Sequence, residues 1–150
     1  MGTGIGLKCP KCSFKKGYNI GVGFSFPRVY ERIVQDIKNY EYGEEWRDFF
    51  QSHPGAAINA EKDLYYCRYC NTIAVEYNLD LYNKKDGTEP EKSYVALWCD
   101  SDKYELVKHY AHHCPNCDGR MRKVSSERAL KSIPCPRCKS ILQVEEYCWD

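Results

Sequence analysis

The sequence predicts a small α+β protein, mainly antiparallel β, built from two cysteine-bearing units, and three observations lead to this prediction. Eight of the ten cysteines form four Cys-x-x-Cys pairs distributed along the 150 residues. Short segments in which apolar and polar residues alternate lie beside these pairs, as half-buried strands require. The main stretch with apolar residues at helical spacing is about residues 28–52, so we expect it to be a helical insertion.

Residues 1–82 form the first expected unit. In residues 18–26, apolar residues alternate with polar residues or glycine, and this pattern favours a strand with bends. Pro27 then opens a helix, and a second short helix over residues 44–51 carries Trp46, Phe49 and Phe50 on one face. The His53-Pro54-Gly55 sequence ends this helix. Residues 64–66 and 72–82 are predicted strands, the latter with the clearest alternation in the chain.

Residues 83–93 are polar, contain glycine and proline, and predict a linker to a second unit over residues 94–150. Strands are expected at residues 94–99, 104–112, 121–124 and 141–147. Ser126 is a candidate cap for a short helix through Lys131.

The four cysteine pairs have the spacing of metal ligands: Cys9/Cys12, Cys67/Cys70, Cys114/Cys117 and Cys135/Cys138. A turn with two intervening residues places both sulfurs about 2.3 Å from one ion, so two such turns complete a four-thiolate shell. The 17 residues between Cys117 and Cys135 match a two-pair zinc site. We therefore expect the last two pairs to share one ion and the first two pairs to share another.

The cysteine turns carry a family resemblance. The sequences Cys9-Pro10-Lys11-Cys12, Cys114-Pro115-Asn116-Cys117 and Cys135-Pro136-Arg137-Cys138 resemble the knuckles of zinc-ribbon and rubredoxin-like proteins. Residues 26–57 resemble a family of small bacterial zinc-ribbon proteins. The resemblance implies two zinc-ribbon units and no activity.

The residue after each second cysteine departs from the family's glycine. Asn71 and Asp118 tolerate positive φ, whereas Ser13 and Lys139 do so less readily, so we expect the knuckles at Ser13 and Lys139 to be less regular.

Other potential ligands lie outside the four pairs. His109, His112 and His113 precede the third pair, and we expect them to be exposed strand residues rather than ligands of a further site. Cys99 and Cys148 are expected to be buried small apolar residues.

The sequence contains no pattern typical of a catalytic centre, so we predict a non-catalytic protein with two structural Zn²⁺ ions and no small-molecule substrate. The same thiolates suit iron, and Cys-Pro-x-Cys also occurs in dithiol redox sites, so a rubredoxin-like iron protein or a dithiol redox protein is the minor alternative.

A protein partner is the first expectation for function, because small ribbons dock through strand edges and aromatic faces. We expect the face with Trp46, Phe49 and Phe50 to be that surface. Nucleic-acid binding is the alternative, through the basic residues between positions 120 and 139: Arg120, Arg122, Lys123, Arg128, Lys131, Arg137 and Lys139.

Charge and hydropathy exclude other classes. No apolar run reaches the length of a membrane span, and the first residues lack a secretion signal, so the expected location is the cytoplasm. The formal charge of +1 counts every cysteine as neutral. With two zinc ions on eight thiolates the charge becomes about −3.

Overall fold

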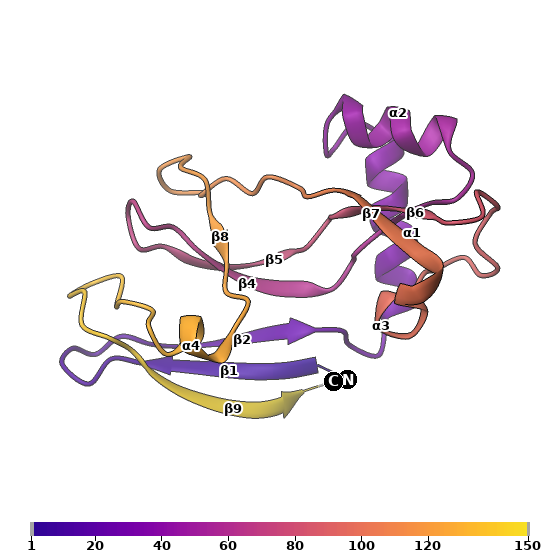
Figure 1. Cartoon of the computed structure of the whole chain (residues 1–150). Coiled ribbons are helices and arrows are strands. Elements are labelled where there is room, and N and C mark those ends of the chain that lie inside the picture. The colour runs from indigo at the N-terminus through magenta and orange to yellow at the C-terminus, as the bar shows by residue number, and fades with distance from the viewer. Residues whose placement is uncertain (1, 150) are drawn as a thin grey trace. The chain divides into compact units, whose positions relative to one another are not determined.

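The computed structural model of this chain describes residues 2–149, which form two units (Figure 1). Unit 1 comprises Met1–Phe24, Glu61–Tyr77 and Ala111–Asp150, and unit 2 comprises Ser25–Ala60 and Asn78–Tyr110. This division differs from the expected one at residues 83–93. Each unit takes segments from both halves of the chain, because its strands pair over long sequence distances.

Unit 1 is an antiparallel sheet. Its strands are β1 (Gly2–Lys8), β2 (Lys15–Gly21), β4 (Lys62–Tyr66), β5 (Ile73–Tyr77), β8 (Arg122–Lys123) and β9 (Gln143–Trp149). The order is β5-β4-β2-β1-β9, and β8 pairs with β4. One short helix, α4 (Glu127–Leu130), accompanies the sheet, and Ser126 Oγ caps it by accepting a hydrogen bond from the Ala129 N–H, which confirms the predicted cap.

The two terminal strands, β1 and β9, pair along their whole length, from Gly2 opposite Trp149 to Lys8 opposite Gln143. The Tyr147 ring lies over Gly4, where a Cβ atom would come within 1.9 Å of the ring. The Tyr147 hydroxyl donates a hydrogen bond to Asn19 Oδ1 on β2 at 3.2 Å. An aromatic side chain on β9 therefore covers glycine on β1 and ties three strands together.

The main core of unit 1 includes cysteines as well as aliphatic side chains. Leu7, Cys9, Ile133, Cys135 and Leu142 are all nearly inaccessible to solvent and belong to one cluster. A smaller cluster contains Tyr65, Cys67, Cys114 and Met121. The first cysteine of each of the four pairs is thus part of the folded interior.

Unit 2 contains the longer helices and a second sheet. Its helices are α1 (Phe26–Lys38), α2 (Glu44–Ser52) and α3 (Leu97–Asp100), followed by the 3-10 helix η1 (Ser101–Lys103). The sheet has the order β3-β6-β7, with β3 (Ala56–Ile58), β6 (Leu81–Lys84) and β7 (Tyr104–Lys108). The two predicted longer helices are confirmed in α1 and α2.

Two predicted strands differ from the structure. The expected strand over residues 72–82 is divided into β5 and β6, and Leu79 between them adopts a φ of 64°, which no extended strand allows. The expected strand over residues 94–99 is wrong, because Leu97–Asp100 forms helix α3, whose Leu97 side chain is buried.

Trp46 belongs to the interior of unit 2. It is buried, its Nε1–H donates a hydrogen bond to the Leu79 carbonyl oxygen at 2.8 Å, and its ring meets that of Tyr110 edge-on. The Phe49 ring stacks on His53. The expectation of a docking surface that includes Trp46 is therefore wrong, because this indole fills the core of its own unit.

Within residues 2–149, no helix has both the length and the apolar character needed to cross a membrane.

Candidate metal centres

The eight paired cysteines gather in two groups of four within unit 1. Group A consists of Cys9, Cys12, Cys135 and Cys138, and group B consists of Cys67, Cys70, Cys114 and Cys117. In each group the four sulfurs lie within 4.8 Å of one another. Among the described residues, these are the two places where three or more cysteine, histidine or carboxylate ligands meet in this way.

The expected pairing of the knuckles is wrong. The first pair joins the fourth and the second joins the third, whereas sequence spacing predicted the first with the second and the third with the fourth. The cause is strand pairing: β9 lies beside β1 and brings Cys135 and Cys138 to Cys9 and Cys12. Likewise Arg122 on β8 pairs with Tyr66 on β4, which places the third knuckle beside the second.

All four knuckles lie at one end of the unit 1 strands (Figure 1). The turns β1–β2 and β4–β5 carry the first two knuckles, and bridges His113–Arg120 and Pro134–Ile141 close the last two into hairpins. Each group therefore joins a turn between neighbouring strands to a hairpin formed far away in the sequence.

The sulfur spacing fits a tetrahedral thiolate site. The sulfur–sulfur distances are 3.4 Å for Cys9–Cys138 and 3.5 Å for Cys12–Cys135 in group A. In group B they are 3.4 Å for Cys67–Cys117 and 3.6 Å for Cys70–Cys114. A metal ion about 2.3 Å from each sulfur requires an edge of about 3.8 Å, close to these values. All ten cysteines are free thiols, so no disulfide competes for the sulfurs.

The backbone of the knuckles also suits thiolates. Backbone N–H groups of Lys11 and Cys12 donate to Cys9 Sγ, Asn116 N–H donates to Cys114 Sγ, and Arg137 N–H donates to Cys135 Sγ, each at 3.4 Å. Donors aimed at sulfur stabilise its negative charge and so favour metal-bound thiolate.

Three of the four knuckles share one backbone form. Asn71, Asp118 and Lys139 have φ values of 62°, 60° and 64°, and each N–H donates to the carbonyl oxygen of the first cysteine of its pair. Ser13 lacks positive φ, so the first knuckle is less regular, as predicted. The same expectation for Lys139 is wrong, because the chain holds it in the left-handed region like Asn71 and Asp118.

Hydroxyl groups distinguish the two knuckles within each group. A hydrogen bond with the Thr72 hydroxyl, 3.1 Å from Cys70 Sγ, is the main cause that lowers the pKa of Cys70 to about 6. The hydroxyl of Ser140 likewise lowers the pKa of Cys138 to about 6. Each group thus contains one thiol with a hydroxyl donor two residues further along the chain.

The partner knuckles lack this hydroxyl. Backbone hydrogen bonds of Phe14 and Gly119 lower the pKa of Cys12 and Cys117, but desolvation and the neighbouring sulfurs outweigh them and raise it to about 12. Four crowded thiols resist losing all their protons until a cation offsets the charge. The donor sets of both groups therefore fit a divalent metal that prefers thiolates.

The remaining cysteines and the histidines lie outside both groups. Cys99 and Cys148 are exposed, so the prediction that they are buried is wrong. His112 is buried against the Tyr65 ring, 4.2 Å between centroids, which contradicts its expected exposure. His109 Nδ1 lies 2.7 Å from Asp80 Oδ2, and His113 Nδ1 lies 3.3 Å from the Asp118 carbonyl oxygen.

The basic residues between positions 120 and 139 are distributed over several surroundings. Lys123 pairs with Asp63 at 3.3 Å, and Lys131 pairs with Glu127 at 2.7 Å. Arg137, beside group A, donates to Ser13 Oγ at 3.2 Å. Arg128 lies on α4, and Lys139 holds the left-handed position of the fourth knuckle. Arg120 and Arg122 lie beside group B instead.

Arg120 and Arg122 line a recess of about 310 Å³, which we call the Arg–Tyr recess; its residues are Arg68, Tyr69, Arg120, Met121 and Arg122. Three of these residues, Arg68, Tyr69 and Met121, were not among the predicted site residues. The position of Arg68 and Tyr69 between Cys67 and Cys70 is the sequence signal that could have identified those two.

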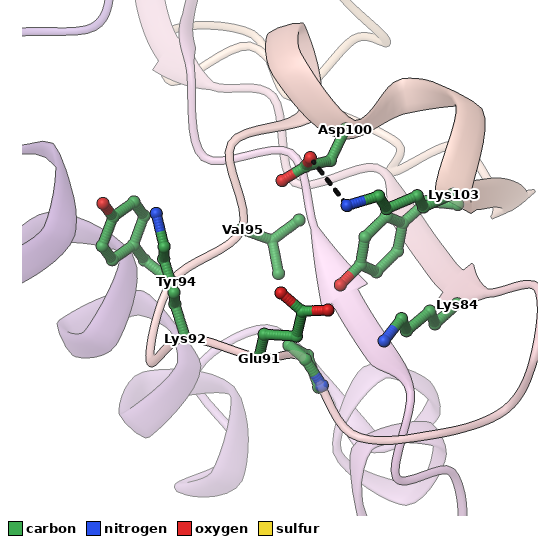
Figure 2. A pocket seen from close by; sticks show the side chains of 9 residues that line it. Lys84, Glu91, Lys92, Tyr94, Val95, Asp100 and Lys103 are labelled. Atoms are coloured by element: carbon green, nitrogen blue, oxygen red, sulfur yellow. Dashed lines mark ion pairs between the residues drawn. The ribbon is translucent and has the colours of Figure 1, made fainter.

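Unit 2 contains a separate recess of about 190 Å³. Figure 2 shows Lys84, Glu91, Asp100 and Lys103 around it. Both lysines contact neighbouring residues of unit 2: Lys103 pairs with Asp100 at 3.6 Å, and Lys84 donates to Thr88 Oγ1 at 3.1 Å and to the Glu89 carbonyl oxygen at 3.4 Å. This network fastens the segment that follows β6.

Comparison with protein-family models, curated proteins and solved structures finds no match to this chain. The two four-cysteine groups fit zinc-ribbon-like metal sites, and this likeness rests on their geometry.

Proposed function

We propose that the protein is a non-catalytic zinc protein, with one structural Zn²⁺ in group A and one in group B. The observation that carries the proposal is the closed set of four cysteine sulfurs in each group. Four thiolates complete a tetrahedral shell and leave no coordination position for water or substrate. When bound, the metal supplies stability, because free energy of binding to a structural site adds to that of folding.

Metal analysis of the full-length chain tests this proposal. We expect two zinc ions per chain, released when the protein is denatured, when its thiols are modified or when a strong chelator competes for the metal. A content below one metal per chain would contradict the architecture. Iron would appear as visible thiolate-to-iron absorption and would favour the rubredoxin-like alternative.

We also propose a cytoplasmic location. Reduced thiols persist in the cytoplasm, and the ten free cysteines support this proposal.

We further propose a recognition role, as a protein-interaction or adaptor module. Two zinc ions would hold unit 1 together without providing a reactive centre, which supports binding rather than catalysis. The burial of Trp46 removes the indole from the surface expected for a protein partner.

Nucleic-acid binding is the second candidate, and the Arg–Tyr recess specifically favours it. Retention of the full chain on heparin and on duplex DNA over a salt gradient tests this candidate. The variant Arg120→Glu/Arg122→Glu/Lys123→Glu should elute at markedly lower salt, because phosphate contacts dominate such binding. Unchanged retention would leave the protein partner as the remaining proposal.

A further inference from the structure

The Arg–Tyr recess combines an exposed aromatic ring with three guanidinium groups. Tyr69 is 64 % exposed, although it lies between two cysteines of group B. Arg68, Arg120 and Arg122 are exposed around it, whereas Met121 is buried and provides an apolar floor. Flat aromatic rings stack on bases, and guanidinium groups bind phosphate, so both parts of a nucleotide have a complementary group here.

The Tyr69 ring has a fixed support. It lies against Gly119 of the third knuckle, where a Cβ atom would come within 2.6 Å of Tyr69 Cδ2. The Arg68 guanidinium carbon lies 5.2 Å from the ring centroid, and Arg68 Nη2 donates to the Tyr69 hydroxyl at 3.3 Å. Because group B joins the second knuckle to the third, Gly119 supports one side of the ring before any ligand arrives, which favours the stacking position and reduces the entropic cost of binding.

The arginines around the recess carry more positive charge than is needed to offset the negative charge of a metal-loaded group B. A zinc ion with four thiolates carries a charge of about −2, and basic residues near such sites can serve to offset it. Three guanidinium groups surround the recess of group B. Within residues 2–149, none of the three forms an ion pair with a carboxylate. A cationic surplus therefore remains for an external anion.

We propose that the Arg–Tyr recess binds single-stranded nucleic acid, with one unpaired base stacked on Tyr69 and adjacent phosphates bound by Arg120 and Arg122. The proposal rests on the nucleic-acid candidate and specifies its ligand. An unpaired base is needed because the faces of a base inside a duplex are occupied by its neighbours. Arg120 and Arg122 are two residues apart around the β8 start, so they can contact phosphates beside that base.

Fluorescence anisotropy with the full, zinc-loaded chain tests the proposal, using a labelled 12-nucleotide oligo(U), the corresponding oligo(dT), a duplex of equal length and UMP as competitor. We expect the single strands to bind about tenfold more tightly than the duplex, since only an unpaired base can stack on Tyr69. UMP should compete only weakly because it offers one phosphate.

Substitutions separate stacking from charge. Tyr69→Leu should weaken single-strand binding about tenfold, whereas Tyr69→Phe, which keeps the ring, should remain within about twofold of the original chain. Arg120→Gln/Arg122→Gln should reduce the slope of log affinity against log salt by about 1.4, the value for two phosphate contacts on a single strand. The matched control is Lys15→Gln/Lys16→Gln on β2, which removes the same charge outside the recess and should leave the slope nearly unchanged.

The outcomes distinguish this proposal from the broader ones. Equal affinity for duplex and single strand, or a Tyr69→Leu chain that binds normally, overturns the stacking site but leaves nucleic-acid binding intact. If UMP binds as tightly as the 12-nucleotide strand, the ligand is a single nucleotide and the proposal of a strand-binding site is wrong. No binding to any of these probes at low salt overturns both nucleic-acid proposals. Zinc content, measured for every variant, reports separately on the proposed metal sites.

Discussion

Groups A and B each consist of four cysteines, yet different strand pairings and different core residues hold the two groups together. Group A is joined by the full-length pairing of β1 with β9, and its Cys9 and Cys135 belong to the larger core cluster. Group B is joined through only two paired positions of β4 and β8, and its cluster of buried residues is smaller. The same coordination set can thus form part of a core at one position and the support of a surface at another.

The arginines beside the two groups also make different contacts. Beside group A, the guanidinium carbon of Arg137 lies 5.8 Å from the centroid of the Phe14 ring, and Arg137 Nη1 donates a hydrogen bond to Ser13 Oγ. This guanidinium group therefore contacts residues of unit 1. Beside group B, the guanidinium groups of the Arg–Tyr recess surround an exposed ring. We infer that group A mainly stabilises unit 1, whereas group B mainly positions residues for recognition.

The largest expected effect is that of metal removal. A structural zinc ion contributes on the order of 10–16 kcal/mol of apparent binding free energy, so stripping both ions should unfold unit 1. Group B has fewer supporting contacts, and we therefore expect a chelator to remove its metal first. Native mass spectrometry should show a one-zinc species, in which amide exchange remains slow in β1 and β9.

Further chelation should then unfold β1 and β9, whereas α1 and α2 keep their helical circular-dichroism signal, because unit 2 has its own core and contains neither group. Loss of both ions in a single step would contradict the difference between the groups. Cys114→Ser and Cys135→Ser provide the matched test, since each is the buried first cysteine of its knuckle and the second should destabilise unit 1 more.

The knuckles were predictable from sequence, but their partners were not. Cys-x-x-Cys spacing is a local property, and it identified all eight cysteines of groups A and B. Which knuckles meet depends on the pairing of β1 with β9 and of Tyr66 with Arg122, over separations that no local pattern encodes. The 17-residue spacing of Cys117 and Cys135 was misleading, because the intervening chain contains β8 and α4, which connect two different groups.

The same limitation applies to single side chains. Helical spacing correctly placed Trp46 on the apolar face of α2, but it could not distinguish an exposed stripe from a buried one. The carbonyl of Leu79, which accepts the indole hydrogen bond, is 33 residues away. Hydrophobic pattern therefore predicted α1 and α2 but not α3, and tertiary contacts determined which side chains remained exposed.

A glycine on β1 tests how strongly group A depends on the terminal strands. Gly4→Ala should lower the free energy of unfolding of unit 1 by about 2 kcal/mol, because the new methyl group overlaps the Tyr147 ring and must displace it from the sheet. The control is Gly6→Ala on the same strand, where the nearest atoms would be 3.7 Å from the new carbon. Gly6→Ala should leave stability unchanged or raise it by about 0.5 kcal/mol, since alanine restricts the unfolded chain.

Urea unfolding followed by amide exchange of β9 measures both variants. If Gly4→Ala and Gly6→Ala unfold at the same urea concentration, the Tyr147 contact does not hold β9 in place, and the support of group A must come from the cysteine shell alone.

The hydroxyl donors test whether the two groups are chemically equivalent. Thr72→Val removes the donor to Cys70 in group B, and Ser140→Ala removes the donor to Cys138 in group A. Each should weaken zinc binding at its own group about tenfold, the lower end for partners that hydrogen-bond a metal ligand. Competition with a chromophoric chelator measures the change. A loss at one group only would show that the shared Cys-x-Thr/Ser arrangement has different roles in the two places.

The smallest effect on stability is expected at Gly119, but it separates support from recognition most directly. In Gly119→Ala the new methyl group would lie 2.6 Å from Tyr69 Cδ2 and 3.2 Å from Cys117 Sγ. Because Tyr69 is largely exposed, its ring can move away at a cost of about 1 kcal/mol or less, and group B should keep its zinc. Binding to oligo(U) should nevertheless fall nearly as far as in Tyr69→Leu, since the ring leaves its place in the recess. A variant that loses zinc together with binding would show instead that the Cys117 contact dominates, and that group B and the Arg–Tyr recess cannot be separated.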